Sequence, residues 1–187
     1  AIPMLLERLG VYVEKLYCDP NGNFPHNPEP LKEHLGDICK LVPEERADLG
    51  IVVDPDVDRL AFIDEKGEMF GEEYTLVACA DYVLSENPGN TVSNLSSSRA
   101  LRDVTQKHGG TYYAAAVGEV NVVTKMKEVK AVIGGEGNGG IIYPDSHYGR
   151  DALVGVALFL THLAKKQMKV SELRASYPAY FMSKKKI

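Results

Sequence analysis

Hydrophobic positions along the chain follow two alternating kinds of pattern. In residues 30–42 apolar side chains recur at helical spacing, with Leu31, Leu35 and Ile38 on one stripe, which predicts an amphipathic helix. Residues 49–53 form a short apolar run of the kind found in a buried sheet strand. The same patterns predict further helices over residues 2–9, 72–86, 96–109, 118–129, 152–166 and 170–175. They predict strands over residues 11–17, 49–53, 60–64, 91–95, 111–117, 130–135 and 140–144.

The alternation of strands and helices indicates an α/β fold in which helices cover the sheets. We expect two consecutive small three-layer domains with mixed sheets flanked by helices. The predicted boundary lies near Gly71, just before the long helix, and divides the chain into residues 1–71 and 72–187. Because the first domain opens on a helix with no strand before it, we expect it to lack its first strand.

Composition narrows the classes of partner. The 187 residues carry a net charge of −5, and their only dense basic run is Lys184-Lys185-Lys186. A nucleic-acid-binding protein concentrates Lys and Arg on one face, so no nucleic-acid partner is expected. No apolar stretch reaches the length of a membrane span and the start lacks signal-peptide features, so no membrane partner is expected either. The three cysteines are few and widely spaced, which is typical of buried thiols in a reducing compartment and predicts a cytoplasmic protein.

An acidic loop, Asp-Pro-Asp-Val-Asp-Arg at residues 54–59, directly follows the predicted strand at 49–53. Asp54, Asp56 and Asp58 stand at alternate positions, so their carboxylates can converge on one hard cation. Three oxygen ligands leave an octahedral Mg²⁺ open to water molecules and to a substrate phosphate. Arg59 adds a planar cation suited to a phosphate close to the metal.

Three other interpretations of the acidic loop compete with this one. A calcium-binding EF-hand would use Glu65 as its twelfth residue, but it requires Gly where Arg59 stands and helices where strands are predicted. It is therefore rejected. A haloacid-dehalogenase-type phosphatase also places Asp-x-Asp after a strand, although it usually has Thr or Val where Asp58 stands. That phosphatase and a plain acidic turn remain as alternatives.

A glycine-rich segment, residues 134–140, follows the predicted strand at 130–135. Its five glycines let the backbone approach a ligand closely, and Glu136 and Asn138 can hydrogen-bond neighbouring hydroxyls. The segment is not a Walker loop, because Gly-Lys-Ser/Thr is missing, and it does not fit the dinucleotide fingerprint. Alone, such a segment is often only a turn.

Together the two loops resemble those of the α-D-phosphohexomutase family, which includes the phosphoglucomutases and phosphomannomutases. Residues 54–59 are similar to the family's metal loop, Asp-Gly-Asp-x-Asp-Arg, with Pro55 in place of the first Gly. Residues 135–140 are similar to its sugar-specificity loop, whose core is Gly-Glu-x-Ser/Asn-Gly. Val117-Gly118-Glu119 lies where the family has a further ligand-facing loop. The resemblance covers the whole chain and concerns the second and third of the family's four domains.

The resemblance implies a role for each matching residue. Asp54, Asp56 and Asp58 would be the Mg²⁺ ligands, and the catalytic Arg59 would lie beside a phosphoserine. The residues expected to bind substrate, mainly its sugar hydroxyls and phosphate, are Glu136, Asn138, Gly118, Glu119, His147 and Arg150. His147 is equally well explained as an ordinary loop histidine. For Arg150 a ligand role is favoured over a helix-start arginine paired with Asp145 or Asp151.

The sequence departs from the family pattern in three respects. Gly140 stands where some members have His, so His147 and Arg150 are candidates to supply the missing donors and positive charge. Residues 25–28, Pro-His-Asn-Pro, only superficially resemble the phosphoserine motif of the family's first domain, because no Ser precedes the His. The phosphate clamp of the fourth domain is also absent from the sequence.

We therefore expect this chain to be part of an intramolecular phosphotransferase that interconverts hexose 1-phosphate and hexose 6-phosphate. By the resemblance, the reaction uses a phosphoserine and a bisphosphorylated intermediate, and the missing first and fourth domains are the chain's partners. The chain alone is expected to be inactive and to bind Mg²⁺ loosely. The alternatives are a phosphoglucosamine mutase, which usually has Gln-Ser where Gly137-Asn138 stand, and a non-catalytic module that binds Mg²⁺ and sugar phosphate.

Overall fold

The computed structural model describes residues 1–182, so the basic run at 184–186 lies outside the described part. Its helices are α1 (Ile2–Arg8), η1 (Lys32–His34), α2 (Gly36–Glu44), α3 (Glu72–Glu86), α4 (Ala100–Lys107), α5 (Glu119–Val129), α6 (Ala152–Lys166) and α7 (Val170–Ala175). Its strands are β1 (Gly50–Val53), β2 (Leu60–Ile63), β3 (Asn90–Asn94), β4 (Tyr112–Ala115), β5 (Ala131–Glu136) and β6 (Gly140–Ile142). The predicted α/β fold class is confirmed, with one antiparallel and one mixed sheet.

The smaller sheet pairs β1 with β2 in antiparallel register, with Gly50 opposite Ile63 and Val53 opposite Leu60. Successive side chains of a strand point to opposite faces. Ala61 and Ile63 therefore pack with the hydrophobic side chains of α2, while Leu60 and Phe62 pack into the main core on the other face. Both faces of this sheet are thus covered.

The larger sheet has the strand order β4-β3-β5-β6, in which β3 is parallel to β4 and to β5, and β5 is antiparallel to β6. Helix α5 covers one face, where Val122 and Met126 are fully buried against Val92 and Ile142. Helices α3, α4 and α6 cover the other face through a core that includes Ile133 and Ile141. The parallel strands end at one edge, which is where ligands bind in open α/β sheets.

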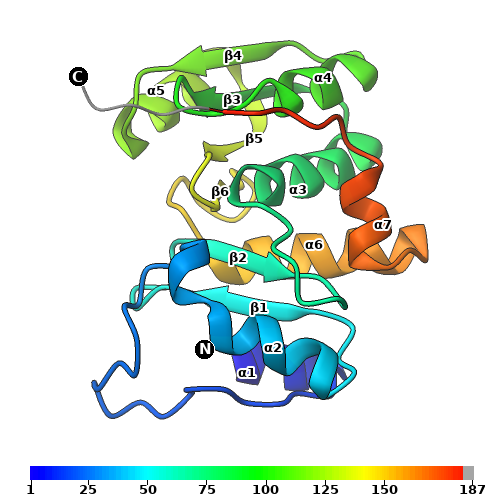
Figure 1. Cartoon of the computed structure of the whole chain (residues 1–187). Helices are drawn as coiled ribbons and strands as arrows, with labels where there is room; N and C mark the ends of the chain where they lie inside the picture. The colour runs from blue at the N-terminus through cyan, green and yellow to red at the C-terminus, as the bar shows by residue number, and fades with distance from the viewer. Residues whose placement is uncertain (183–187) are drawn as a thin grey trace.

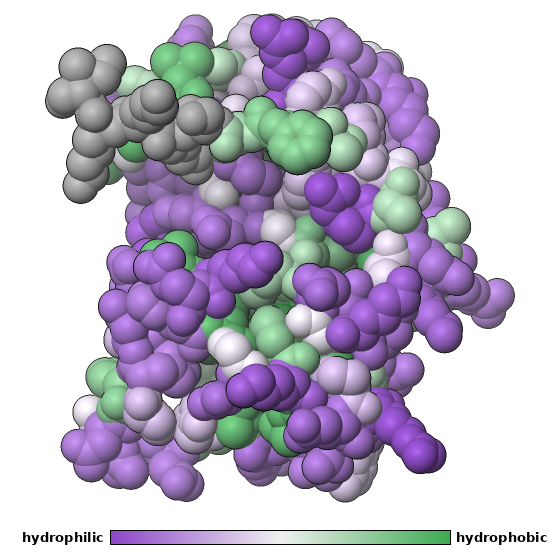
Figure 2. All heavy atoms as spheres, viewed as in Figure 1, coloured by the Kyte–Doolittle hydropathy of each residue, from purple (hydrophilic) through white to green (hydrophobic). Residues whose placement is uncertain are grey.

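Helices α3 and α6 lie between the two sheets and contact both of them (Figure 1). Phe62 of β2 and Phe159 of α6 stack with their ring centroids 3.8 Å apart. Gly71, where the sequence predicts the domain boundary, lies in the connection between β2 and α3, and the apolar core continues across it. Figure 2 shows that hydrophilic side chains cover most of the viewed face, with apolar side chains visible in its middle and near its top.

Three predicted elements differ from the structure. The strand predicted at 11–17 is not formed, and Tyr12 is largely exposed, because no strand within residues 1–182 lies alongside to satisfy the backbone of this segment. The helix predicted at 30–42 is instead the short η1 turn followed by α2. The helix predicted at 96–109 begins only at Ala100, because the preceding serines form a turn around Asn94.

No helix within residues 1–182 combines the length and the apolar character that spanning a membrane requires.

Candidate functional site

The acidic loop connects β1 to β2 and is folded around one buried carboxylate. Asp54 is almost fully buried, and its Oδ1 accepts the backbone N–H groups of Asp58 and Arg59, each at 3.0 Å. Val57 closes the loop by donating its N–H to the Asp54 carbonyl oxygen at 3.1 Å, and it has a φ of +59°. That backbone region is unfavourable for a β-branched side chain. The loop therefore holds a strained turn that gathers its three carboxylates.

Two arginines neutralise part of the loop's negative charge. Arg59 donates from Nε to Asp54 Oδ2 at 2.5 Å and from Nη1 to Glu29 at 3.3 Å. Burial opposes ionisation of Asp54, but the hydrogen bonds from Arg59 and Asp58 outweigh it and lower the pKa of Asp54. Burial, together with the charge of Asp54, raises the pKa of Asp58 despite the opposing charge of Arg150. The hydrogen bond to Asp54 raises the pKa of Arg59.

The three aspartates of the loop have the chemistry of a hard-cation site. One carboxylate oxygen from each of Asp54, Asp56 and Asp58 lies within 4.8 Å of the other two. Asp54 is buried, Asp58 is partly buried and Asp56 is exposed, so the group opens to solvent on one side. Oxygen ligands of this kind suit Mg²⁺, which usually keeps several waters or substrate oxygens among its ligands.

The glycine-rich segment forms the hairpin between β5 and β6 and lies directly against β2. Asn138 Oδ1 accepts the N–H of Gly140 at 3.1 Å and so holds the turn. Gly139 has a φ of +86°, and a Cβ there would lie 2.1 Å from the carbonyl oxygen of Leu60. Only glycine permits this close approach. The hairpin is therefore seated on the strand that follows the acidic loop.

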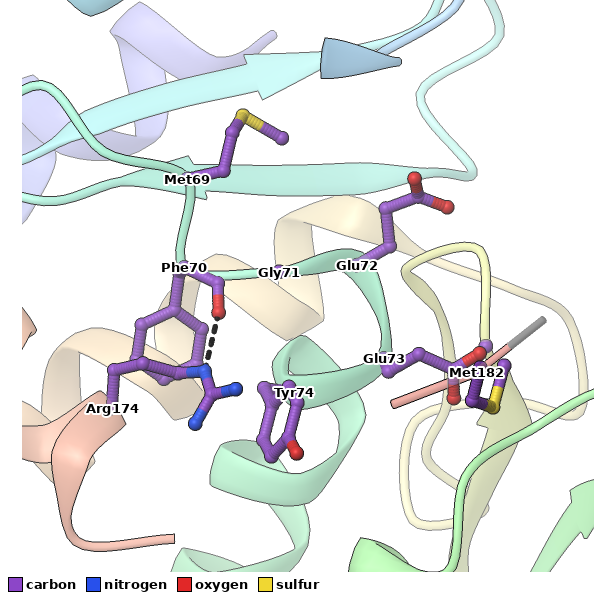
Figure 3. Close-up of a pocket in the computed structure, with 9 residues that line it drawn as sticks. Met69, Phe70, Gly71, Glu72, Glu73, Tyr74, Arg174 and Met182 are labelled. Atoms are coloured by element: carbon purple, nitrogen blue, oxygen red, sulfur yellow. Dashed lines mark hydrogen bonds between the residues drawn. The ribbon is translucent and has the colours of Figure 1, made fainter. Parts of the chain in front are cut away.

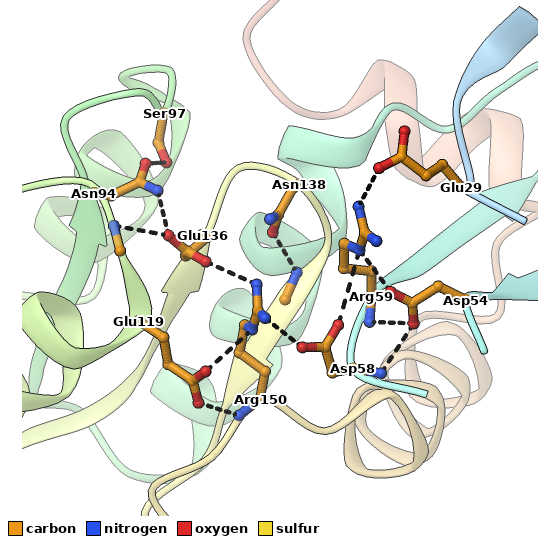
Figure 4. Close-up of polar contacts among 12 residues, drawn as sticks. Glu29, Asp54, Asp58, Arg59, Asn94, Ser97, Glu119, Glu136, Asn138 and Arg150 are labelled. Carbon is orange, nitrogen blue, oxygen red and sulfur yellow. Dashed lines mark hydrogen bonds and ion pairs between the residues drawn. The ribbon is translucent and has the colours of Figure 1, made fainter. Parts of the chain in front are cut away.

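Glu136, at the end of β5, is buried, and both of its carboxylate oxygens accept hydrogen bonds (Figure 4). Its Oε1 accepts from Asn94 Nδ2 at 2.8 Å and from the Gly118 N–H at 3.3 Å. Its Oε2 accepts from Arg150 Nη1 at 2.9 Å. Asn94 did not appear among the candidates from sequence. The sequence feature that could have indicated Asn94 is its place at the end of a predicted strand, because neighbouring parallel strands end at the same edge of a sheet.

Arg150 joins the acidic loop to the hairpin. Its Nη2 donates to Asp58 Oδ2, while Nη1 donates to Glu136 and Nε lies 3.5 Å from Glu119 Oε2 (Figure 4). The backbone N–H of Arg150 also donates to Glu119 Oε1 at 3.1 Å. The pairing considered from sequence was with Asp145 or Asp151. The structure instead pairs Arg150 with carboxylates from the acidic loop, the end of β5 and the start of α5.

The other predicted site residues fall into two groups. Gly118 and Glu119 belong to the same cluster as Glu136, through the contacts just described. His147 uses both ring nitrogens within its own loop, because Nδ1 accepts the Gly149 N–H at 3.0 Å and Nε2 lies 2.9 Å from Asp151 Oδ2. Its side chain is half exposed. The structure therefore ties His147 to the start of α6.

A pocket of about 430 Å³ lies beside this cluster, around the start of α3 (Figure 3). It shares Gly137 with the hairpin and is also lined by Glu73, Tyr74 and Arg174. The Arg174 guanidinium lies 3.4 Å from the centroid of the Tyr74 ring and donates from Nε to the Phe70 carbonyl oxygen. The three aspartates are not among its lining residues, so the convergent carboxylates rather than this hollow define the candidate site.

Fold and site together define a class of α/β protein that places a three-carboxylate loop beside a glycine-rich hairpin with a buried glutamate. Two family models match the chain. They are described as phosphoglucomutase/phosphomannomutase, alpha/beta/alpha domain II, at residues 1–67, and the corresponding domain III, at residues 71–180. The chain belongs to the phosphoglucomutase/phosphomannomutase family, as its two loops suggested.

Relatives with curated names support the same assignment. The chain is 37% identical to a phosphoglucomutase/phosphomannomutase of Thermococcus kodakarensis, over 99% of this chain and 41% of the relative. It is 34% identical to a probable phosphoglucosamine mutase of Methanopyrus kandleri, over 95% of this chain and 40% of the relative. The chain thus spans about two fifths of the length of the curated relatives it matches.

A solved structure supports the fold assignment independently. A phosphoglucomutase/phosphomannomutase family protein of Burkholderia thailandensis superposes with a TM-score of 0.85 at 29% identity. The match covers 95% of this chain and 39% of that one. The arrangement of sheets and helices described above is therefore that of the family.

Proposed function

We propose that the protein containing this chain is a phosphohexomutase that interconverts hexose 1-phosphate and hexose 6-phosphate. One observation supports this most directly. Three convergent carboxylates and the buried Glu136 lie on either side of one side chain, Arg150. Carboxylates that can hold a metal ion beside a phosphate, and a glutamate that can bind sugar hydroxyls, are thereby brought within reach of one sugar phosphate. Family membership points to the same reaction class.

In this proposal Asp54, Asp56 and Asp58 hold Mg²⁺, which would neutralise charge on a phosphoryl group during transfer. Arg59, held by Asp54 and Glu29, keeps a fixed cation beside that position. Asn94 and the Gly118 N–H hold the Glu136 carboxylate in a fixed orientation in which it can accept a sugar hydroxyl. Asn138, at the tip of the hairpin, is the second hydroxyl-binding group. The rest of the protein is proposed to supply the phosphoserine and the remaining phosphate contacts, so the present chain alone is inactive.

Glucose and mannose phosphates are the substrates we propose, because Gly137-Asn138 follow Glu136 rather than Gln-Ser. Relatives named as phosphoglucosamine mutases match at 34% identity, which keeps glucosamine phosphate as the second candidate. Initial rates of the whole protein on glucose, mannose and glucosamine 1-phosphates would separate the two. A preference for glucosamine 1-phosphate would exclude the first assignment.

The test of the reaction is phosphorus NMR with Mg²⁺, glucose 1-phosphate and a trace of glucose 1,6-bisphosphate. The whole protein should produce glucose 6-phosphate, and the 187-residue chain should only shift the 1-phosphate signal. Asp56→Asn should abolish conversion by the whole protein, whereas Asp145→Asn, which removes another exposed carboxylate, should not. Full activity in the Asp56→Asn protein would refute the metal-site assignment.

A further inference from the structure

Arg150 lies within a cluster of carboxylates from three separate segments of the chain. Asp58 comes from the acidic loop, Glu136 from the end of β5 and Glu119 from the start of α5. The Arg150 side chain is only 20% exposed. Its Nε is buried and makes no hydrogen bond within residues 1–182, although Glu119 Oε2 lies 3.5 Å away. Each of the three guanidinium nitrogens thus faces a carboxylate of the protein itself.

The space that Arg150 occupies depends on a glycine of the hairpin. A Cβ added to Gly140 would lie 2.5 Å from Arg150 Cδ and 3.2 Å from Asn138 Oδ1. A distance of 2.5 Å between carbon atoms is far below van der Waals contact. The aliphatic stem of Arg150 therefore passes over the bare Cα of Gly140. A side chain at position 140 would push the guanidinium away from its present partners.

The backbone of Arg150 is fixed as firmly as its side chain. Asp151 caps α6 by accepting the N–H of Leu153 at 2.7 Å and that of Val154 at 3.2 Å. The next residue, Ala152, donates its N–H to the carbonyl oxygen of Val57, inside the acidic loop, at 3.0 Å. The start of α6 is thereby hydrogen-bonded to the loop whose carboxylate Arg150 contacts. Arg150 thus reaches Asp58 from a preorganised position.

Arg150 and a metal ion would bind the same carboxylate. Asp58 Oδ2 accepts from Arg150, and Asp58 is also one of the three convergent aspartates. A divalent cation at this group must share Asp58 with the guanidinium and bear its repulsion at short range. At the same time, Arg150 compensates the charge of the buried Glu136. Without Arg150, Glu136 would share this cluster with the carboxylates of Asp58 and Glu119 and no cation between them.

We propose that Arg150 is a positioning residue with two opposite effects: it holds Glu136 in place for the sugar, and it weakens metal binding by competing for Asp58. This inference rests on the proposed function of the two loops. It assigns Arg150 a role between the loops in place of direct contact with substrate. The result is a site whose metal affinity is set by an internal cation.

Calorimetric titration of the 187-residue chain with MgCl₂, without sugar, tests the competition. Arg150→Met should bind Mg²⁺ more tightly by roughly tenfold, which corresponds to about 1.4 kcal/mol. Gly140→Ala, which keeps the arginine but displaces it, should shift the affinity in the same direction. Arg8→Met, on the exposed side of α1, removes the same charge elsewhere and should leave Mg²⁺ affinity unchanged. Arg150→Lys provides a second test if the methionine variant does not fold, as judged by circular dichroism.

Titration of the same variants with glucose 1-phosphate, in saturating Mg²⁺, tests the second effect. Arg150→Met should weaken binding of the sugar phosphate about tenfold while Mg²⁺ binding tightens, and this opposition of signs is the signature of a positioning role. A direct phosphate ligand would lose only sugar-phosphate affinity, and a general stabiliser would lose both affinities. Either of those results overturns the inference.

The outcome for Asp56→Asn separates this inference from the proposed function. If Asp56→Asn weakens Mg²⁺ binding but Arg150→Met and Gly140→Ala do not strengthen it, the role of Arg150 is wrong and the metal site stands. If Asp56→Asn leaves Mg²⁺ binding unchanged, the metal site itself is wrong, and the competition proposed for Arg150 is overturned with it.

Discussion

Phe62 of strand β2 stacks face to face on Phe159 of helix α6, with an interplanar angle of 19°. Phe62 lies in the segment that matches family domain II, and Phe159 in the segment that matches domain III. Phe70 completes the group by packing edge-on against Phe159, with centroids 5.1 Å apart. The two segments therefore share one aromatic core.

Truncating this contact should destabilise both segments together. Phe159→Ala is expected to lower the free energy of unfolding by about 3–5 kcal/mol, because a fully buried phenylalanine leaves a cavity that the surroundings fill only partly. Urea unfolding followed by circular dichroism should show one transition at a lower midpoint. Phe181→Ala, at a fully exposed phenylalanine, should change stability by less than about 0.5 kcal/mol. Two separate transitions in the Phe159→Ala protein would contradict the shared core.

The close contact between the hairpin and β2 can be tested by comparing alanine substitutions at two glycines. Gly139 and Gly109 have similar positive φ angles, +86° and +77°, but a Cβ at Gly109 meets nothing within 4 Å. Gly109→Ala should therefore cost only the backbone strain of about 1–2 kcal/mol. Gly139→Ala should cost more, because its Cβ would clash with the Leu60 carbonyl, and it should also weaken glucose 1-phosphate binding. Equal unfolding midpoints for the two variants would show that the close approach is unimportant.

The support that Asn94 gives to Glu136 should affect sugar binding and spare metal binding. Asn94→Asp keeps the shape of the side chain but replaces the amide donor with a carboxylate facing Glu136 Oε1. We expect KM for glucose 1-phosphate in the whole protein to rise about tenfold, since the lost charge-assisted hydrogen bond is worth about 1.5–3 kcal/mol. Asn23→Asp adds the same charge at an exposed position before η1 and should leave KM unchanged. An unaltered KM in Asn94→Asp would remove Asn94 from the site.

A buried polar network outside the acidic loop predicts a pH dependence of stability. Asp81 of α3 is buried, its Oδ1 lies 2.7 Å from His108 Nε2, and its Oδ2 lies 3.2 Å from His162 Nε2. Tyr177 Oη donates to Asp81 Oδ2 at 3.1 Å. Burial opposes ionisation of Asp81, but the hydrogen bonds with His162 and His108 lower its pKa. Burial and the charge of Asp81 raise the pKa of Tyr177.

A folded-state pKa below the unfolded value stabilises the fold at pH values above the unfolded pKa. For Asp81 that contribution is present above about pH 3.9 and is lost as the pH falls toward the lower folded-state pKa. The gap in unfolding free energy between the parent chain and Asp81→Asn should therefore narrow as the pH is lowered below about 4. Asp19→Asn removes an exposed carboxylate and controls for net charge. A gap that stays constant down to low pH would contradict the assignment.

Most regular elements follow from local pattern, because buried strands and amphipathic helices have clear periodicities. The alternation in residues 11–17 misled, since a strand also needs a neighbour for its backbone groups, and periodicity does not reveal one. In the same way, the serines before α4 look like a helix cap, but Asn94 Oδ1 accepts from Ser96 and Ser97 and delays the helix start.

The candidate site could likewise be predicted only where its residues lie close together in the sequence. The acidic loop and Glu136 are recognisable because their chemistry lies within short segments. The partners of Arg150 could not be predicted, because they are 14 to 92 residues away in the chain and meet only through the fold. Asn94 is likewise 42 residues from Glu136, and a single polar residue at the end of a strand carries little signal on its own.

The position of α6 between the two sheets has a mechanical consequence. One end of this helix is hydrogen-bonded to the acidic loop at Val57, its flank packs on β2, and it also contacts β6 of the hairpin. The acidic loop and the hairpin thus both contact helix α6. The distance between them is set by packing in the core and not by a hinge. Under the proposed function, we therefore expect any opening or closing of the site around its substrate to take place at other joints of the whole protein, and not between the acidic loop and the hairpin.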